Sequence, residues 1–239
     1  MTISYGLIRR KQEQEAIKII MTLRRELGIN FNGKKVLDVG CETGCKSRAM
    51  KECGADVYAV EPNSEALEEA YIANNKKFNS FVQDLPSELF GTFDMVTMFL
   101  YRVLPSGIST MEFSKETGEK VNKMQLEVTK TIARLIKPNG EIIIEISDMP
   151  DDYYLYQETN NIAPLMWQLR QAFEEVYYET TSYDSIFIRA KKPLPNILID
   201  GIKEEDVLYS SLPTNKKELL SDGIYFKEEE IEETSGFGI

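Results

Sequence analysis

The sequence has no histidine, few cysteines and no long apolar run, and each of these absences disfavours a class of site. Histidine is the commonest metal ligand and general base, so its absence disfavours a metal centre and histidine-dependent catalysis. The three cysteines, Cys41, Cys45 and Cys53, match neither a disulfide framework nor a four-ligand zinc site. We therefore expect no metal, and reduced thiols typical of a cytoplasmic protein.

Basic residues are also scarce relative to acidic ones. The formal net charge is −11, and a chain of this charge repels a phosphate backbone, which disfavours a nucleic-acid partner. No run approaches the roughly 20 apolar residues of a membrane-spanning helix, and the polar first residues lack the apolar core of a signal peptide. We expect a cytoplasmic protein without a membrane partner.

The periodicity of the apolar residues predicts helices that alternate with strands. Apolar residues recur at helical spacing between Ala16 and Leu27, which indicates an amphipathic helix near the N-terminus. Short β-branched runs predict buried strands, and the amphipathic segments between them predict helices. The predicted strands are 36–40, 56–61, 78–82, 93–100, 141–147, 175–180 and 184–190. The predicted helices after the first are 45–53, 63–75, 121–136 and 163–173.

This alternation predicts an α/β fold. We expect a doubly wound, Rossmann-like, mostly parallel seven-stranded sheet with an antiparallel last strand and helices on both faces. Residues 1–32 are predicted to form an amphipathic helix that caps the site, and residues 33–192 the α/β domain. Residues 193–239 form an acidic C-terminal extension that carries most of the net negative charge, and it is a candidate surface for a protein partner.

The first strand runs into the glycine-containing turn Asp38-Val-Gly-Cys-Glu-Thr-Gly44. A dinucleotide-binding turn has the pattern G-x-G-x-x-G, which from Gly40 requires glycine at two positions where the chain has Glu42 and Cys45. The turn is therefore not that motif. Glycine in a turn between a strand and a helix also occurs for purely local reasons.

The turn resembles the first motif of class I S-adenosylmethionine-dependent methyltransferases, acidic-x-Gly-x-Gly-x-Gly, with Glu42 in place of the middle glycine. Further segments resemble later motifs of this family in the correct order, over roughly residues 33–192. They are Glu61 at the end of the second predicted strand, the segment 83–86, the fourth strand (93–99) and the turn into the fifth strand (135–145). The resemblance implies S-adenosyl-L-methionine as cofactor and a methyltransferase activity.

The resemblance also implies which residues bind the cofactor. In the turn, Asp38 meets the amino group of the methionine part, while Gly40 lets the backbone approach because it has no Cβ. Inward rotation of the Glu42 carboxylate would repel the methionine carboxylate. The implied cofactor-binding residues are Asp38, Gly40, Cys41, Gly44, Glu61 for the ribose hydroxyls, Asp84 and Leu85 for adenine, and Phe99 nearby.

Residues after the fourth strand are the candidates for the acceptor site. Tyr101 is expected to orient or deprotonate the acceptor, and Arg102 to hold an anionic acceptor. Each of them has an equally ordinary interpretation, as a rim aromatic and a surface charge. The N-terminal helix is expected to fold over the site, where Arg9 or Arg10 would meet the methionine carboxylate.

These patterns favour a methyltransferase that transfers a methyl group to the oxygen or nitrogen of a small-molecule acceptor, which the absence of histidine suggests is an anionic or basic one. One alternative is a protein methyltransferase, with RNA disfavoured by the acidic charge. The other is a catalytically inactive methyltransferase-like binding subunit, an interpretation that Glu42 favours.

Overall fold

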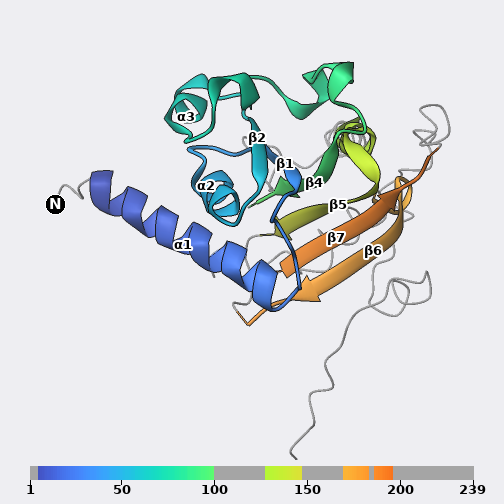
Figure 1. Ribbon diagram of the computed structural model, residues 1–239, viewed down its shortest axis with the longest axis horizontal. Helices are drawn as coiled ribbons and strands as arrows, with labels where there is room; N and C mark the ends of the chain where they lie inside the picture. Colours follow the sequence, from blue (N-terminus) through green and yellow to red (C-terminus); the bar gives the residue numbers. More distant parts are fainter. Residues whose placement is uncertain (1–4, 100–126, 147–168, 183–185, 196–239) are drawn as a thin grey trace, which may run out of the picture.

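The computed structural model describes residues 5–99, 127–146, 169–182 and 186–195 of the chain (Figure 1). One seven-stranded sheet forms its centre, with the strand order β3-β2-β1-β4-β5-β7-β6. The strands are β1 (Lys35–Val39), β2 (Asp56–Val60), β3 (Lys77–Phe78), β4 (Phe93–Met98), β5 (Ile136–Ile146), β6 (Phe173–Thr180) and β7 (Ile186–Pro193).

Strand β7 is antiparallel to both of its neighbours, β5 and β6, whereas the pairs among β1 to β5 are parallel. The predicted fold class, a mostly parallel doubly wound sheet with an antiparallel last strand, is therefore confirmed. The order reverses between β1 and β4, which is where open α/β sheets bind their ligands.

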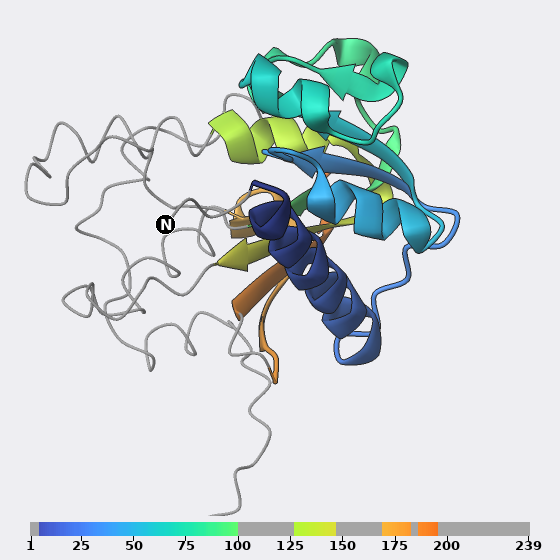
Figure 2. The same cartoon turned by 90° about the vertical axis from the view of Figure 1, so that its left-hand side faces the viewer.

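Helices cover both faces of this sheet (Figure 2). One face carries α1 (Tyr5–Arg25), α2 (Cys45–Glu52) and α3 (Ser64–Glu69), whose apolar side chains form one core cluster with the strands. The helical residues 127–135 pack into a second cluster on the opposite face. No helix in the described ranges is long and apolar enough to cross a membrane.

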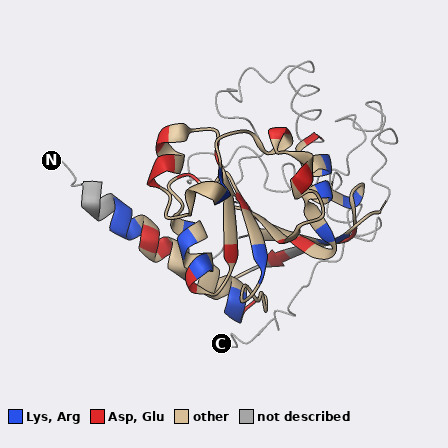
Figure 3. Ribbon diagram, turned by 45° about the horizontal axis from the view of Figure 1, so that its top comes forward, with Lys and Arg blue, Asp and Glu red and all other residues tan. Residues whose placement is uncertain are grey.

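The predicted N-terminal helix is confirmed as α1. It buries Ala16, Ile20 and Leu23, and the last two belong to the core cluster that α2 forms with the strands. Both basic and acidic residues occur along the helix (Figure 3). The end of the helix is fixed to the sheet because Ser182 donates hydrogen bonds to the Glu26 carboxylate from both its backbone N–H and its hydroxyl.

Two predicted elements are shorter than expected. Strand β3 has two residues, because the Asn79 side chain turns back and donates to the carbonyl oxygens of Glu61 and Pro62, at 3.0 Å each. The next residues form the 3₁₀ turns η2 (Val82–Asp84) and η3 (Ser87–Leu89), and another, η1 (Asn74–Lys76), precedes β3. The helix predicted over 63–75, which is α3, ends at Glu69, because Ala70 adopts an extended conformation and packs against Gly44.

Strand β5 is longer than expected, since it includes the residues that were predicted to form a turn before it. Its register with β4 shifts between Phe93 and Met95. Gly140 lies at this irregularity, where an added Cβ would come within 2.8 Å of the Asp94 carbonyl oxygen. The glycine therefore allows β5 to approach β4 closely at a bulge, which lies where a turn was predicted.

Candidate functional site

The turn after β1 keeps the backbone shape of a three-glycine loop although its middle residue is glutamate. Gly40, Glu42 and Gly44 have φ angles of 70°, 49° and 74°, all in the left-handed region. A residue with a side chain adopts that region at a cost of about 1–2 kcal/mol. The Glu42 backbone N–H offsets part of this cost, because it donates a 3.1 Å hydrogen bond to Glu61 Oε2.

The two glycines of this loop have different roles. An added Cβ on Gly40 would meet nothing within 4 Å, so the backbone there faces open space, and its N–H donates to the Val60 carbonyl oxygen at 2.9 Å. On Gly44, an added Cβ would lie 2.8 Å from the Ala70 Cβ. Gly40 is therefore the point of access to the loop, and Gly44 the point where the loop packs against the chain after α3.

Asp38 lies beneath the loop and connects three elements. Its fully buried carboxylate accepts hydrogen bonds from the hydroxyl groups of Ser47, on α2, and Thr97, on β4. Burial raises the pKa of Asp38 to about 6, against the lowering effects of these hydroxyls and of Lys46. The carboxylate therefore fixes the start of α2 relative to the ends of β1 and β4.

This raised pKa predicts a pH dependence of stability. Because Asp38 in the folded protein takes up a proton at higher pH than in the unfolded chain, it contributes stability below its unfolded pKa, and that contribution is lost as pH rises through about 6. As pH rises from about 4 to about 7, we expect the free energy of unfolding of Asp38→Asn to increase by on the order of 2–3 kcal/mol relative to that of the unaltered protein. Urea unfolding of both proteins at each pH measures this difference, and parallel stability curves would contradict it.

Glu61 is the buried acid at the end of β2. Its Oε2 accepts from the Glu42 N–H and its Oε1 from the Asn63 N–H at 2.9 Å. Asn63 in turn caps α3, since its side chain accepts from the N–H groups of Glu65 and Ala66. One carboxylate therefore fixes both the glycine loop and the start of the next helix.

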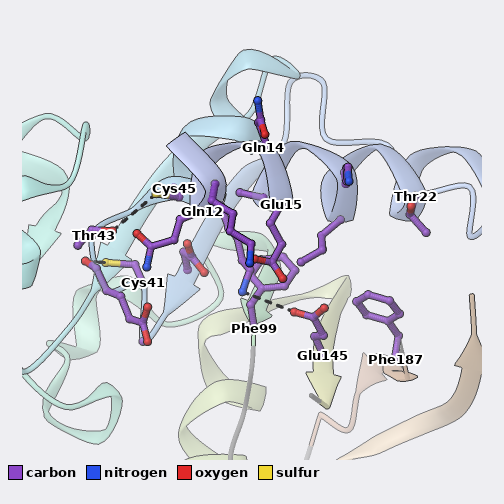
Figure 4. Close-up of a pocket in the computed structure, with 18 of the residues that line it drawn as sticks. Gln12, Gln14, Glu15, Thr22, Cys41, Thr43, Cys45, Phe99, Glu145 and Phe187 are labelled. Carbon is purple, nitrogen blue, oxygen red and sulfur yellow. Dashed lines mark hydrogen bonds and ion pairs between the residues drawn. The ribbon is translucent and has the colours of Figure 1, made fainter. Parts of the chain in front are cut away.

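A pocket of about 730 Å³ opens beside the loop (Figure 4). Loop residues 40–43 line one side and the polar surface of α1 lines another, including Gln12 and Glu15. Glu145 from β5 and Phe187 from β7 contribute to the lining from the sheet. Helix α1 therefore lies across a cavity with polar and apolar walls at the carboxyl ends of the strands.

An ion pair crosses this pocket. Lys46, in the first turn of α2, places its Nζ 3.6 Å from Glu145 Oε2 and 5.2 Å from the centre of the Phe99 ring. Glu145 is buried and Lys46 is largely buried. Neither residue was predicted from the sequence, although the single acid within the apolar run 142–146 was a signal for Glu145.

The predicted cofactor residues divide into three groups. Asp38, Gly40, Cys41 and Phe99 line the pocket, and burial raises the pKa of the Cys41 thiol, which keeps it neutral. Gly44 and Glu61 lie behind this lining and support the loop. Two residues lie farther along the sheet, away from the lining formed by the described residues: exposed Asp84, at the end of η2, and buried Leu85, which follows it.

The predicted residues of the acceptor site, Tyr101 and Arg102, lie outside the described residues. Arg9 and Arg10, the arginines of α1 that were expected to meet the methionine carboxylate, are described, and neither lines the pocket. Arg9 forms ion pairs with Glu13 and Glu69, at 3.7 and 3.8 Å, and lies over the Tyr71 ring, whereas Arg10 is exposed. Among the described residues that line the pocket, the largely buried cation is Lys46.

The sheet order, the loop after β1 and the acid at the end of β2 define a Rossmann-like domain with a cofactor loop at its switch point. The chain belongs to the class I S-adenosylmethionine-dependent methyltransferase family, since the family model of the methyltransferase domain matches residues 8–190. This match confirms the predicted family. S-adenosylmethionine is the cofactor of this family, as predicted.

Individual relatives resemble the chain over part of its length. It is 30% identical over 123 residues to a cypemycin N-terminal methyltransferase of a Streptomyces species, covering 49% of this chain and 44% of the relative. It is also 30% identical over 130 residues to a ubiquinone biosynthesis O-methyltransferase of Vibrio campbellii, covering 52% and 48%. The chain thus matches about half the length of these curated relatives.

Among solved structures, the magnesium protoporphyrin IX methyltransferase of Synechocystis PCC 6803, crystallised with S-adenosylmethionine, has a similar fold. The TM-score is 0.50 at 18% sequence identity, over 80% of this chain and 86% of that one. At this identity the similarity supports the fold alone.

Proposed function

We propose that this protein is an S-adenosylmethionine-dependent methyltransferase that methylates a small molecule bound beneath α1. The observation that carries the proposal is the single pocket lined by both the glycine loop and the polar surface of α1. Its volume of about 730 Å³ falls within the range of small-molecule sites. A cofactor at the loop would thus share one cavity with the acceptor.

The residues present fit this cofactor. Gly40 leaves open space where a side chain would otherwise be, and Glu42 preserves the shape of the loop through its left-handed backbone. We assign the methionine part to Asp38, Gly40 and Cys41, and the ribose to Glu61. The adenine contacts of Asp84 and Leu85 and the position of Phe99 near the cofactor follow from the family pattern.

When bound, the cofactor supplies a methyl group on a positively charged sulfur, which is a good leaving group. The task of the chain is therefore to orient the acceptor and exclude water. Helix α1 and Phe99 line two sides of the pocket, where they would shield bound ligands from water. The acceptor nucleophile is expected to lie in line with the carbon–sulfur bond, and the proposed positioning residues Tyr101 and Arg102 follow β4 directly.

The position of α1 across the pocket favours a small acceptor over a large one, and the acidic charge disfavours nucleic acid. A peptide acceptor is the second candidate, because the Streptomyces relative is named for methylation of an N-terminus. The inactive binding subunit is disfavoured by the backbone of Glu42, which has the conformation of a glycine.

The finer parts of the proposal rest on the sequence alone. An anionic acceptor depends on Arg102, and the protein-binding role of the acidic extension depends on its charge, since residues 196–239 lie outside the described residues. The position of α1 over the pocket supports the proposed capping helix, 1–32. The proposed methyltransferase domain, 33–192, and acidic extension, 193–239, keep the bounds inferred from the sequence.

Calorimetric titration tests the proposal directly. We expect S-adenosylmethionine and its demethylated product, S-adenosylhomocysteine, to bind with dissociation constants in the micromolar range. Incubation with metabolite pools and S-adenosylmethionine should then yield a small molecule that gains the mass of one methyl group. Absence of binding at millimolar ligand would contradict the proposal.

A further inference from the structure

We propose that Lys46 binds the carboxylate of the cofactor's methionine part and that Glu145 positions Lys46 for this role. The inference rests on the proposed function, because it assumes that the cofactor occupies the glycine loop. It assigns to Lys46 the role of binding the methionine carboxylate, which the sequence had suggested for Arg9 or Arg10.

The first reason is the location of the Lys46 ammonium. Lys46 follows Gly44, the last residue of the glycine loop, by two positions, and its side chain lines the same pocket as the loop. Its Nζ lies close to Phe99, which follows β4, and to Glu145 on β5. Figure 4 draws the ion pair to Glu145 as a dashed line. The ammonium is thus held beside the loop, over the ends of the central strands.

The second reason is charge. Asp38, Glu42 and Glu145 all line the pocket, and together they would repel a carboxylate that enters it. Among the described lining residues, Lys46 is the only cation that is largely buried, since the other two lysines, Lys11 and Lys18, are exposed on α1. A ligand carboxylate beside the loop therefore needs Lys46 to offset this repulsion.

The third reason is hydrogen-bonding capacity. A lysine ammonium has three N–H donors. The 3.6 Å separation between Lys46 Nζ and Glu145 Oε2 is longer than a normal N–H···O hydrogen bond. The contact with the Phe99 ring is a cation–π interaction and not a conventional hydrogen bond from an N–H group. Among the described residues, these contacts hold the ammonium in place and leave its donors available to a ligand.

Glu145 contributes through Lys46. A lysine side chain loses considerable conformational entropy when a ligand fixes it, and a prior ion pair reduces that loss. Glu145 is itself fixed, because it is buried in the central strand β5 between apolar neighbours. The first turn of α2 adds a partial positive charge at the same place.

The test compares two ligands that differ at the amino-acid end. S-adenosylhomocysteine carries the carboxylate, whereas 5′-methylthioadenosine lacks the whole amino-acid group. In Lys46→Gln we expect calorimetric affinity for S-adenosylhomocysteine to fall by about tenfold to a hundredfold, and that for 5′-methylthioadenosine to stay unchanged. Lys46→Arg should retain most of the affinity. Glu145→Gln should lose less than Lys46→Gln, with the same difference between ligands.

Lys18→Gln is the matched control, because it removes an exposed lysine that lines the same pocket, and both affinities should remain unchanged. Equal losses for both ligands in Lys46→Gln, or no loss for either, would overturn the proposal. Retained binding of 5′-methylthioadenosine also reports that the variant is folded. If the unaltered protein binds neither ligand, the proposed function fails instead; if it binds both equally well, only the role of Lys46 fails.

Discussion

Replacement of Glu61 by alanine is expected to weaken the binding of S-adenosylhomocysteine by about a hundredfold. Two losses combine in this variant. The buried carboxylate fixes the loop through the N–H groups of Glu42 and Asn63, at 3.1 and 2.9 Å. Its oxygens have further lone pairs, which we assign to the ribose hydroxyls of the cofactor.

The loop is sensitive to this change because Glu42 is held in a left-handed conformation, with φ of 49°. Without the acceptor of its N–H, the residue can relax towards a conformation that is normal for glutamate, and this would move the backbone that faces the pocket. Glu61→Gln should be intermediate, since its amide retains one acceptor oxygen and places an NH₂ group against the other donor.

Calorimetry of three variants separates the two roles of Glu61. Glu68→Ala, which removes an exposed acid of α3, is the control and should bind normally. An analogue of S-adenosylhomocysteine without the 2′-hydroxyl should bind less tightly than the parent ligand to the unaltered protein, yet equally to Glu61→Ala. Unchanged affinity of Glu61→Ala for the parent ligand would remove Glu61 from the ribose site.

The features that the sequence predicted are those that depend on local pattern. Alternating apolar runs and amphipathic segments specify a parallel sheet with helices on both faces, and this prediction is confirmed. The loop was found because Asp38, Gly40 and Gly44 match the first motif of the family, and the two glycines are at positions with left-handed backbone angles. The conformation of Glu42 was not predictable, since nothing local in the sequence compels glutamate to adopt it.

The features that the sequence did not predict depend on contacts between distant segments. The Lys46–Glu145 pair joins α2 to β5 and becomes visible only when both lie beside Phe99. Likewise, Asn79 ends β3 by bonding to the chain after β2, and Ala70 ends α3 by packing against Gly44. Periodicity carries no information about such contacts, which is why β3 and α3 exist as predicted but are shorter.

The position of α1 depends on another distant contact. Arg189, buried on β7, donates a 3.1 Å hydrogen bond to the Leu27 carbonyl oxygen just after the helix. It also pairs with Glu141 on β5 at 2.7 Å and with Glu179 on β6 at 3.4 Å. The guanidinium thus joins three strands to the end of the helix that lies over the pocket.

Arg189→Ala should therefore lower the free energy of unfolding by about 3–5 kcal/mol, because it leaves two partly buried carboxylates without their cation. Urea unfolding measures the loss. Lys192→Ala is the control on the same strand, since its exposed ion pair with Glu175 should contribute less than about 1 kcal/mol. A loss as small as that of the control would mean that the two glutamates find other partners, and that packing alone holds the end of α1 against the sheet.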